Sequence, residues 1–144
     1  MKTKKYENGF TLIELMIGIA VIAILTTIAV NTYSGYLIRA YRSDAQATLI
    51  QGSQFMERIR LENGSYKPGG VAPTLPATLG QSPASGTARY AIALDATTST
   101  TFTLTATPST SIATQEICGN LVVDHSGLKT FSAVTGDMRT CWGN

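Results

Sequence analysis

The chain of 144 residues carries 11 basic and 9 acidic side chains, so its formal net charge is +2 at pH 7. Three of the basic residues and one acid lie in the first nine positions, which leaves eight of each sign in the rest of the chain. This neutrality disfavours a nucleic-acid binder that works through overall positive charge, and the length allows one membrane-associated segment plus one small domain. The low content of charged residues suits a β-rich domain outside the cytoplasm better than a cytosolic enzyme.

An apolar stretch follows the N-terminal lysines. Between Phe10 and Val30 only Glu14 can carry a charge. A helix of this length is about 30 Å long and therefore suffices to cross the hydrocarbon core of a bilayer. The lysines before it place the N-terminus in the cytoplasm and the C-terminal domain on the outer side by the positive-inside rule.

A secretory signal peptide and a plain single-pass anchor are the two simplest interpretations of this N-terminus. The apolar stretch is longer than the one in a secretory signal, and the nearest small-residue cleavage site, around Thr27 to Ala29, is weak. A plain anchor leaves Glu14 unexplained, because a carboxylate in hydrocarbon costs several kcal/mol and usually has a partner.

The segment Gly9-Phe10-Thr11-Leu12-Ile13-Glu14-Leu15-Met16 resembles the class III signal sequence of the type IV pilin family. The resemblance implies cleavage after Gly9, N-methylation of Phe10 as the new first residue, and a role in assembly for Glu14. Further similarity, most of all to PilE-type minor pilins, lies in Arg42–Ala47, Gln54–Arg58, Asn63–Tyr66, Cys118-Gly119, Asp124–Lys129 and Cys141-Trp142. The segment from Lys67 to Gly86 contributes little to the resemblance.

The family implies a structural subunit, not an enzyme, that is processed by prepilin peptidase and assembled into a type IV pilus. Its partners would be other pilin subunits in a homo- or hetero-polymer, the inner-membrane assembly machinery, and membrane lipid before assembly. The precursor would lie in the inner membrane with its head in the periplasm, and the assembled subunit in the extracellular pilus. Adhesion, twitching motility and DNA uptake are the associated roles.

Two alternatives stay open. A type II secretion pseudopilin would share the N-terminus, but it typically lacks a C-terminal disulfide and can carry a calcium site. A membrane-anchored module that binds DNA or another ligand through its head would need only a local basic patch, despite the neutral overall charge.

The chain differs from many pilins at two positions of the first helix. Ala23 and Asn31 stand where those relatives carry a helix-weakening glycine and proline. We therefore expect the helix to stay more continuous in the filament than in the major pilins.

The residues after Val30 predict an amphipathic continuation of the helix. Apolar and small side chains recur at spacings of three and four along one face, while Tyr33 and Tyr36 lie where an aromatic belt would meet the membrane surface. The opposite face carries Arg39, Arg42, Gln46, Glu57 and Arg60. Asn63-Gly64 predicts a left-handed C-cap, so the helix should run from about residue 10 to 62.

The remainder predicts an α+β type IV pilin fold, in which the C-terminal half of the long helix packs on an antiparallel sheet of about four strands. Alternating apolar residues indicate strands near 89–94, 102–106, 119–123 and 128–131, after an irregular loop from Lys67 to Gly86. The expected divisions are a cleaved leader at 1–9, a membrane or filament-core helix at 10–30, an amphipathic half at 31–62 and a β head at 63–144.

The two cysteines, Cys118 and Cys141, predict one disulfide in a chain that leaves the cytoplasm; two unrelated buried cysteines are the alternative. Trp142 is expected to pack against that disulfide, with an exposed adhesive role as the alternative. His125, the single histidine, is expected in a surface turn, because neighbouring residues on one turn seldom converge as nucleophile and base. We expect no catalytic residues, no cofactor and no metal site.

Overall fold

The structure, a computed structural model, describes residues 10–132 and 135–143. The chain divides into two compact units between Tyr36 and Leu37. Helix α1, Leu12–Asn63, contributes to both units and continues without a break from Ala23 to Asn31. That the helix also stays continuous in a filament, as Ala23 and Asn31 indicate, remains a prediction.

Local hydrogen bonds explain where α1 begins and where it ends. Thr11 hydrogen-bonds Glu14 at the start, which places the first helical residue at Leu12, two residues later than expected. At the other end Gly64 adopts φ 71°, and its N–H donates to the carbonyl of Arg60 at 2.7 Å. A residue with positive φ just after the helix satisfies an otherwise unpaired carbonyl, so the predicted glycine C-cap ends this helix.

The second unit contains an antiparallel sheet of five strands in the order β1-β2-β3-β4-β5. The strands are β1 Gln81–Ser82, β2 Tyr90–Thr97, β3 Phe102–Pro108, β4 Leu121–Asp124 and β5 Lys129–Phe131. The fold class predicted from the sequence is confirmed, with one strand more than expected. That strand, β1, comes from the segment expected to be irregular, and it has only two residues, too few for an alternating pattern.

The segment between α1 and β1 otherwise contains two single 3₁₀ turns, Pro68–Gly70 and Ala77–Leu79. Strand β2 is longer than expected. It continues past an irregularity in the register between Leu94 and Ala96, so Asp95, expected in a loop, lies at a bulge inside the strand.

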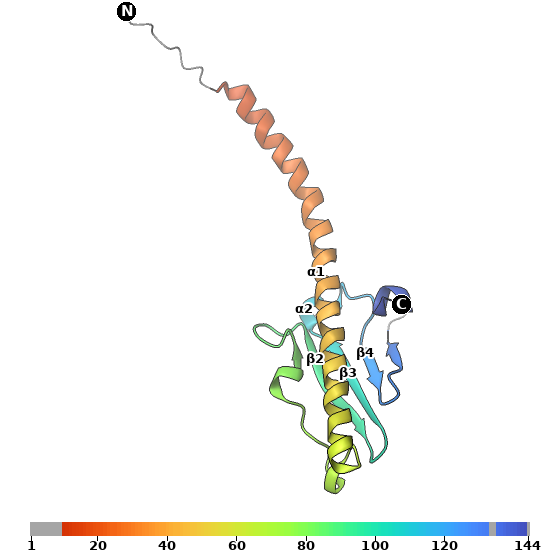
Figure 1. The fold of residues 1–144 in the computed structure, drawn as a ribbon. Helices are drawn as coiled ribbons and strands as arrows, with labels where there is room; N and C mark the ends of the chain where they lie inside the picture. The colour runs from red at the N-terminus through yellow and green to blue at the C-terminus, as the bar shows by residue number, and fades with distance from the viewer. Residues whose placement is uncertain (1–9, 133–134, 144) are drawn as a thin grey trace, which may run out of the picture. The chain divides into compact units, whose positions relative to one another are not determined.

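The core lies between α1 and one face of the sheet, as Figure 1 shows. Successive side chains of a strand point to opposite faces, so every second residue of β3 and β4, and of β2 as far as Leu94, faces the helix. Gly52 lets α1 approach the sheet closely, because a Cβ there would lie 3.1 Å from Cδ1 of Leu104. The fully buried large side chains are Leu49, Met56, Tyr66, Tyr90, Phe102, Leu104, Leu121 and Val123.

Tyr66 connects the last turns of α1 to the sheet by ring packing and hydrogen bonds. Its ring meets Phe102 edge-on with centroids 4.9 Å apart, and its hydroxyl donates to Glu57 at 2.5 Å while accepting from Arg60 at 3.1 Å. Burial raises the pKa of Tyr66, with the hydrogen bond to Glu57 as the second cause. The tyrosine therefore stays neutral and keeps donating its proton.

Two short helices were not expected from the sequence. Helix α2, Thr110–Ala113, follows β3, and helix α3, Met138–Trp142, ends the described chain. Asp137 caps α3 by accepting a hydrogen bond from the backbone N–H of Thr140 at 2.6 Å. Both helices span five residues or fewer, which is too short for a periodic apolar pattern to reveal them.

Arg42 corrects the sequence analysis, which placed it on the helix face opposite the apolar one. The residue is 4% exposed, and its guanidinium lies 2.7 Å from the Glu116 carboxylate. The same guanidinium donates to the carbonyl of Thr140 at 3.2 Å. Arg42 therefore joins α1 to the loop after α2 and to α3.

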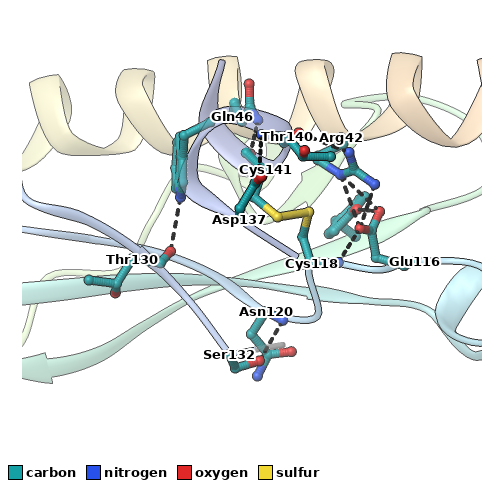
Figure 2. The surroundings of a disulfide bond; sticks show 12 residues. Arg42, Gln46, Glu116, Cys118, Asn120, Thr130, Ser132, Asp137, Thr140 and Cys141 are labelled. Carbon is teal, nitrogen blue, oxygen red and sulfur yellow. Dashed lines mark hydrogen bonds and ion pairs between the residues drawn. A yellow bond between two sulfur atoms is a disulfide. The ribbon is translucent and has the colours of Figure 1, made fainter. Parts of the chain in front are cut away.

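Glu116 accepts the other hydrogen bonds of this buried cluster (Figure 2). Its carboxylate accepts from the Tyr90 hydroxyl at 2.5 Å and from the N–H of Cys118 at 2.8 Å. Burial raises the pKa of Tyr90, and the neighbouring Glu116 adds to this, so the hydroxyl remains a donor. A buried carboxylate is tolerated because an arginine and further donors satisfy its oxygens.

The disulfide joins Cys118 and Cys141, which are both fully buried and 23 residues apart. Gln46 on α1 donates to the carbonyl of Cys141 at 2.5 Å, and α1 reaches the Cys118 end indirectly, through the pair of Arg42 with Glu116 (Figure 2). A Cβ at Gly136 would meet Sγ of Cys141 at 2.5 Å and the carbonyl oxygen of Ile117 at 3.0 Å. Only glycine fits beside the disulfide here.

Replacing Arg42 by methionine should destabilise the head by about 3–5 kcal/mol, because it leaves the Glu116 carboxylate buried without its cation. The measurement is urea denaturation of the oxidised head from residue 37 onward, which contains every residue of the core. Arg39→Met is the matched control, since Arg39 is exposed one turn earlier on α1, and it should cost less than about 0.5 kcal/mol. Equal effects of the two substitutions would contradict the buried pair.

Replacing Gly136 by alanine should destabilise the head by about 1–3 kcal/mol, as overpacking of a filled site does. Gly80→Ala serves as control, because a Cβ there meets only the carbonyl oxygen of Ala77 at an ordinary 3.6 Å. Thermal denaturation of the oxidised head, with free thiols counted beforehand, compares the two. An unchanged melting temperature for Gly136→Ala would show that the site is roomier than the geometry indicates.

Candidate functional site

The N-terminal part of α1 exposes an apolar surface to its surroundings. Every residue from Phe10 to Ala29 is exposed, including the large apolar side chains from Leu12 to Ile28. Among the described residues, α1 is the one helix that is long and apolar enough to cross a membrane by length and composition. Such a surface must be covered by lipid or by other protein, because apolar area in contact with water is unfavourable.

Glu14, the one acid in this apolar segment, forms a capping box with Thr11. The hydroxyl and the backbone N–H of Thr11 donate to Oε2 of Glu14 at 2.8 and 3.0 Å, and the N–H of Glu14 donates back to the Thr11 hydroxyl at 3.3 Å. The signature, threonine followed three residues later by glutamate, is readable in the sequence, and the sequence analysis missed it. Thr11 thus gives the carboxylate a local partner.

A shallow groove lies beside Glu14, on the surface of the same helix. It is lined by Phe10, Glu14, Leu15, Gly18, Ile19 and Ile22, and we call it the Gly18 groove. At Gly18 a Cβ would meet nothing within 4 Å. Phe10 and Glu14, which the sequence singled out, therefore line one groove; Gly9 lies outside the described residues.

The C-terminal loop presents a second surface. Trp142 is 6% exposed, and its indole N–H donates to the carbonyl of Thr130 at 3.0 Å, so the tryptophan is anchored to β5 and is not an exposed adhesive residue. The ammonium of Lys129 lies over the indole ring, 5.4 Å from its centroid. Arg139 is exposed on α3. Among the described residues, neither cation forms an ion pair.

Two aspartates, half-buried Asp124 and exposed Asp137, fix the turns around this loop. Hydrogen bonds from Ser126, first its hydroxyl, hold the pKa of Asp124 below its ordinary value, and those from Thr140 do the same for the pKa of Asp137. A carboxylate whose folded pKa is depressed stabilises the fold above its unfolded pKa and loses this contribution as pH falls through the folded value. His125, next to Asp124, is exposed in the turn between β4 and β5.

Two protein-family models match successive parts of the chain. Residues 31–122 match the family model described as "Type IV minor pilin ComP, DNA uptake sequence receptor". Residues 4–30 match the "Prokaryotic N-terminal methylation motif", which includes Gly9, Phe10 and Glu14. The first match alone covers more than half of the chain.

Two curated relatives show how far the similarity reaches. The chain is 41% identical over 58 residues to Prepilin peptidase-dependent protein D of Escherichia coli K12, covering 40% of each protein. It is 35% identical over 83 residues to Fimbrial protein Q of Moraxella bovis, covering 58% of this chain and 53% of the relative. The matched part thus spans about half or less of the length of these relatives.

Among solved structures, the chain resembles the non-core minor pilin PilV of Neisseria meningitidis, with a TM-score of 0.55 and 21% identity over 72% of this chain and 94% of that one. This likeness concerns the fold: a helix packed on an antiparallel sheet. Together with the methylation motif and the match over 31–122, it identifies the chain as a type IV pilin that belongs to the minor pilin family described as ComP.

Proposed function

We propose that this chain is a minor subunit of a type IV pilus, processed between Gly9 and Phe10 by a prepilin peptidase, methylated on Phe10 and assembled through its N-terminal helix. The observation that carries the proposal is the lone carboxylate of Glu14 in the otherwise apolar and exposed segment 10–29, inside a methylation motif. Processing creates an amine on Phe10, which is a cation at the edge of the same apolar segment. A buried acid and a buried cation of neighbouring subunits attract each other strongly.

Before assembly, the segment from residue 10 to 30 lies in the inner membrane, with the leader 1–9 in the cytoplasm, the amphipathic half 31–62 following it and the head 63–144 in the periplasm. The inner-membrane machinery then moves the subunit into a filament of pilins, homo- or heteropolymeric, where protein contacts replace lipid. A pseudopilin of type II secretion is the competing assignment; the disulfide and the minor pilin family match favour the pilus.

Replacing Glu14 by alanine or by glutamine should lower incorporation into filaments by at least about tenfold, because removing one partner of a buried charge pair costs about 3–5 kcal/mol. Glutamine keeps the capping box with Thr11 but has no charge, so the two variants separate helix capping from charge pairing. The measurement is the amount of subunit in purified filaments relative to the membrane pool.

Mass analysis provides the controls for this experiment. Both Glu14 variants should show the processed mass with a methylated Phe10, whereas a bulky residue in place of Gly9 should leave the precursor mass unchanged. Wild-type incorporation of the glutamine variant would reject charge pairing and leave capping as the role of Glu14.

DNA binding by the head is a second candidate function. The family description and the two cations at the C-terminal loop, Lys129 and Arg139, favour it, although the head from residue 37 onward has only eight basic against seven acidic side chains. If these cations contact phosphates, binding should weaken linearly in log salt, since each neutralised phosphate releases counterions.

The double variant Lys129→Ala/Arg139→Ala should weaken binding of the head to duplex DNA and reduce the salt slope by about 2, as expected for two lost phosphate contacts. Fluorescence anisotropy between 50 and 200 mM salt, roughly the range in which such contacts dominate, measures both quantities. Arg58→Ala is the matched control, because Arg58 faces Glu62 at 3.9 Å near the other end of the helix. A slope that the double variant leaves unchanged would exclude this surface.

A further inference from the structure

Two arginines surround α1 at the point where it enters the head. Arg39 is exposed on the helix itself. Arg89, the residue before β2, places its guanidinium over the ring of Tyr41, 5.1 Å from the ring centroid. Residues two apart on a helix point about 200° apart, so the two cations lie on nearly opposite sides of α1. We call Arg39, Tyr41 and Arg89 the arginine collar.

The collar offers hydrogen-bond donors that suit a phosphate group. Nη1 of Arg89 donates to the Ser111 hydroxyl at 3.1 Å, and that hydroxyl lies 2.9 Å from the hydroxyl of Ser109. Among the residues that the structure describes, neither arginine of the collar forms an ion pair. A guanidinium beside two hydroxyls can hold a phosphate, because its planar N–H groups match the phosphate oxygens.

The acids of the head leave few free carboxylates for these cations. Of the seven acids from residue 37 onward, six accept a hydrogen bond or an ion pair within the head: Asp44, Glu57, Glu62, Glu116, Asp124 and Asp137. Asp44, one turn after Tyr41, accepts from the Ser82 hydroxyl. The head of a second copy therefore offers the collar little beyond Asp95, whereas a bilayer with anionic phospholipid offers many phosphates.

The covalent connection to the apolar stretch limits how far the collar can lie from a membrane. Arg39 follows Val30 by nine positions, and nine residues of helix rise about 14 Å. The headgroup layer extends roughly 5–8 Å beyond the hydrocarbon core, and an arginine stem can reach toward it. The remaining separation is at most about one Debye length, ~8 Å at physiological salt, so the charges attract each other.

We propose that the arginine collar docks the head on the anionic phospholipid of the membrane that holds the N-terminal segment, with a lipid phosphate on Arg89 and the hydroxyls of Ser109 and Ser111. This rests on the membrane-inserted state in the proposed function and adds to it the class of lipid that the head contacts before assembly. Two arginines near an anionic surface favour the docked head roughly thirtyfold, which is about 2 kcal/mol. Extraction of the subunit then has to break these contacts.

The test identifies the molecule that lies beside Arg89. The full-length chain is reconstituted in nanodiscs with p-benzoylphenylalanine in place of Thr110, which is exposed between the two serines. Discs of phosphatidylcholine are compared with discs that also contain about a third of the anionic lipid phosphatidylglycerol. Mass analysis should show a phosphatidylglycerol adduct at position 110, and most of it should be lost at about 1 M salt, where the Debye length falls to about 3 Å.

A second photocrosslinking position controls for unspecific capture of lipid. Leu61 is 85% exposed in the last turn of α1, at the end of the helix away from the collar. The same photoreactive residue in place of Leu61 should give no lipid adduct in either kind of disc.

Arginine substitutions then test the collar itself. Arg39→Gln/Arg89→Gln should lower the phosphatidylglycerol adduct roughly thirtyfold, and Arg39→Gln alone about fivefold. Arg39 is exposed and forms no ion pair among the described residues, so its variant isolates the charge from any effect on folding. Arg89→Lys keeps the charge and should retain most of the adduct. Arg58→Gln/Lys67→Gln removes the same net charge, beginning about 28 Å further along the helix, and should stay within about twofold of wild type.

The outcomes separate this docking from the proposed function. A chain that does not float with liposomes would overturn the membrane-inserted state itself. An inserted chain whose position 110 captures no lipid, or captures it regardless of lipid charge and of the arginine substitutions, would overturn the collar and leave the inserted state standing. Adducts to a second subunit in place of lipid would overturn it too. So would an Arg39→Gln/Arg89→Gln variant that loses DNA binding but keeps its lipid adduct.

Discussion

The buried ion pair between Arg42 and Glu116 is the interaction on which the architecture of the head depends. Through it the helix, the second strand and the C-terminal loop share one cluster, because Glu116 also binds Tyr90 and the N–H of Cys118. A buried ion pair is stable only when further hydrogen bonds satisfy the polar atoms that the two charges leave unpaired. The cluster meets that condition, and among the described residues no buried side-chain nitrogen or oxygen lacks a hydrogen-bond partner.

The disulfide adds a covalent restraint to the same region. By the loop-entropy model a bridge of this span is worth about 3 kcal/mol, which is a large share of the stability of a small domain. Gln46 and Arg42 hold α3, and Asp137 caps it, so the last residues of the chain are fixed to the helix at several points. Arg139 lies on this anchored helix, and Lys129 lies over the ring of Trp142 at its end.

The N-terminal segment, unlike the head, does not bury its side chains within the chain. Its side chains from residue 10 to 29 are exposed, and what stabilises them lies outside the chain, in lipid or in neighbouring subunits. Within this segment the polar contacts are local: Thr11 caps the helix through Glu14, three residues away. Such a contact holds the carboxylate through one of its two oxygens, since both donors of Thr11 bind Oε2.

The sequence by itself determined the features of this protein that depend on residues close to one another along the chain. The segment from Gly9 to Met16 identifies the family, the apolar stretch gives the long helix, and alternation gives β2, β3 and β4, because these signals arise from neighbours along the chain. The strand β1 and the helices α2 and α3 were missed, since elements of two to five residues leave no periodic signal. The capping box of Thr11 and Glu14 was legible in the sequence but overlooked.

Only the tertiary structure decided the partners of Arg42 and Trp142. Arg42 lies 74 residues from Glu116 and 98 from Thr140, and a helical wheel shows it as one more cation on a polar face. The indole N–H of Trp142 donates to the Thr130 carbonyl across 12 residues, a partner that no sequence pattern indicated. The pairing of distant polar groups depends on which surfaces the fold brings together and desolvates, and no local pattern of residues encodes that choice.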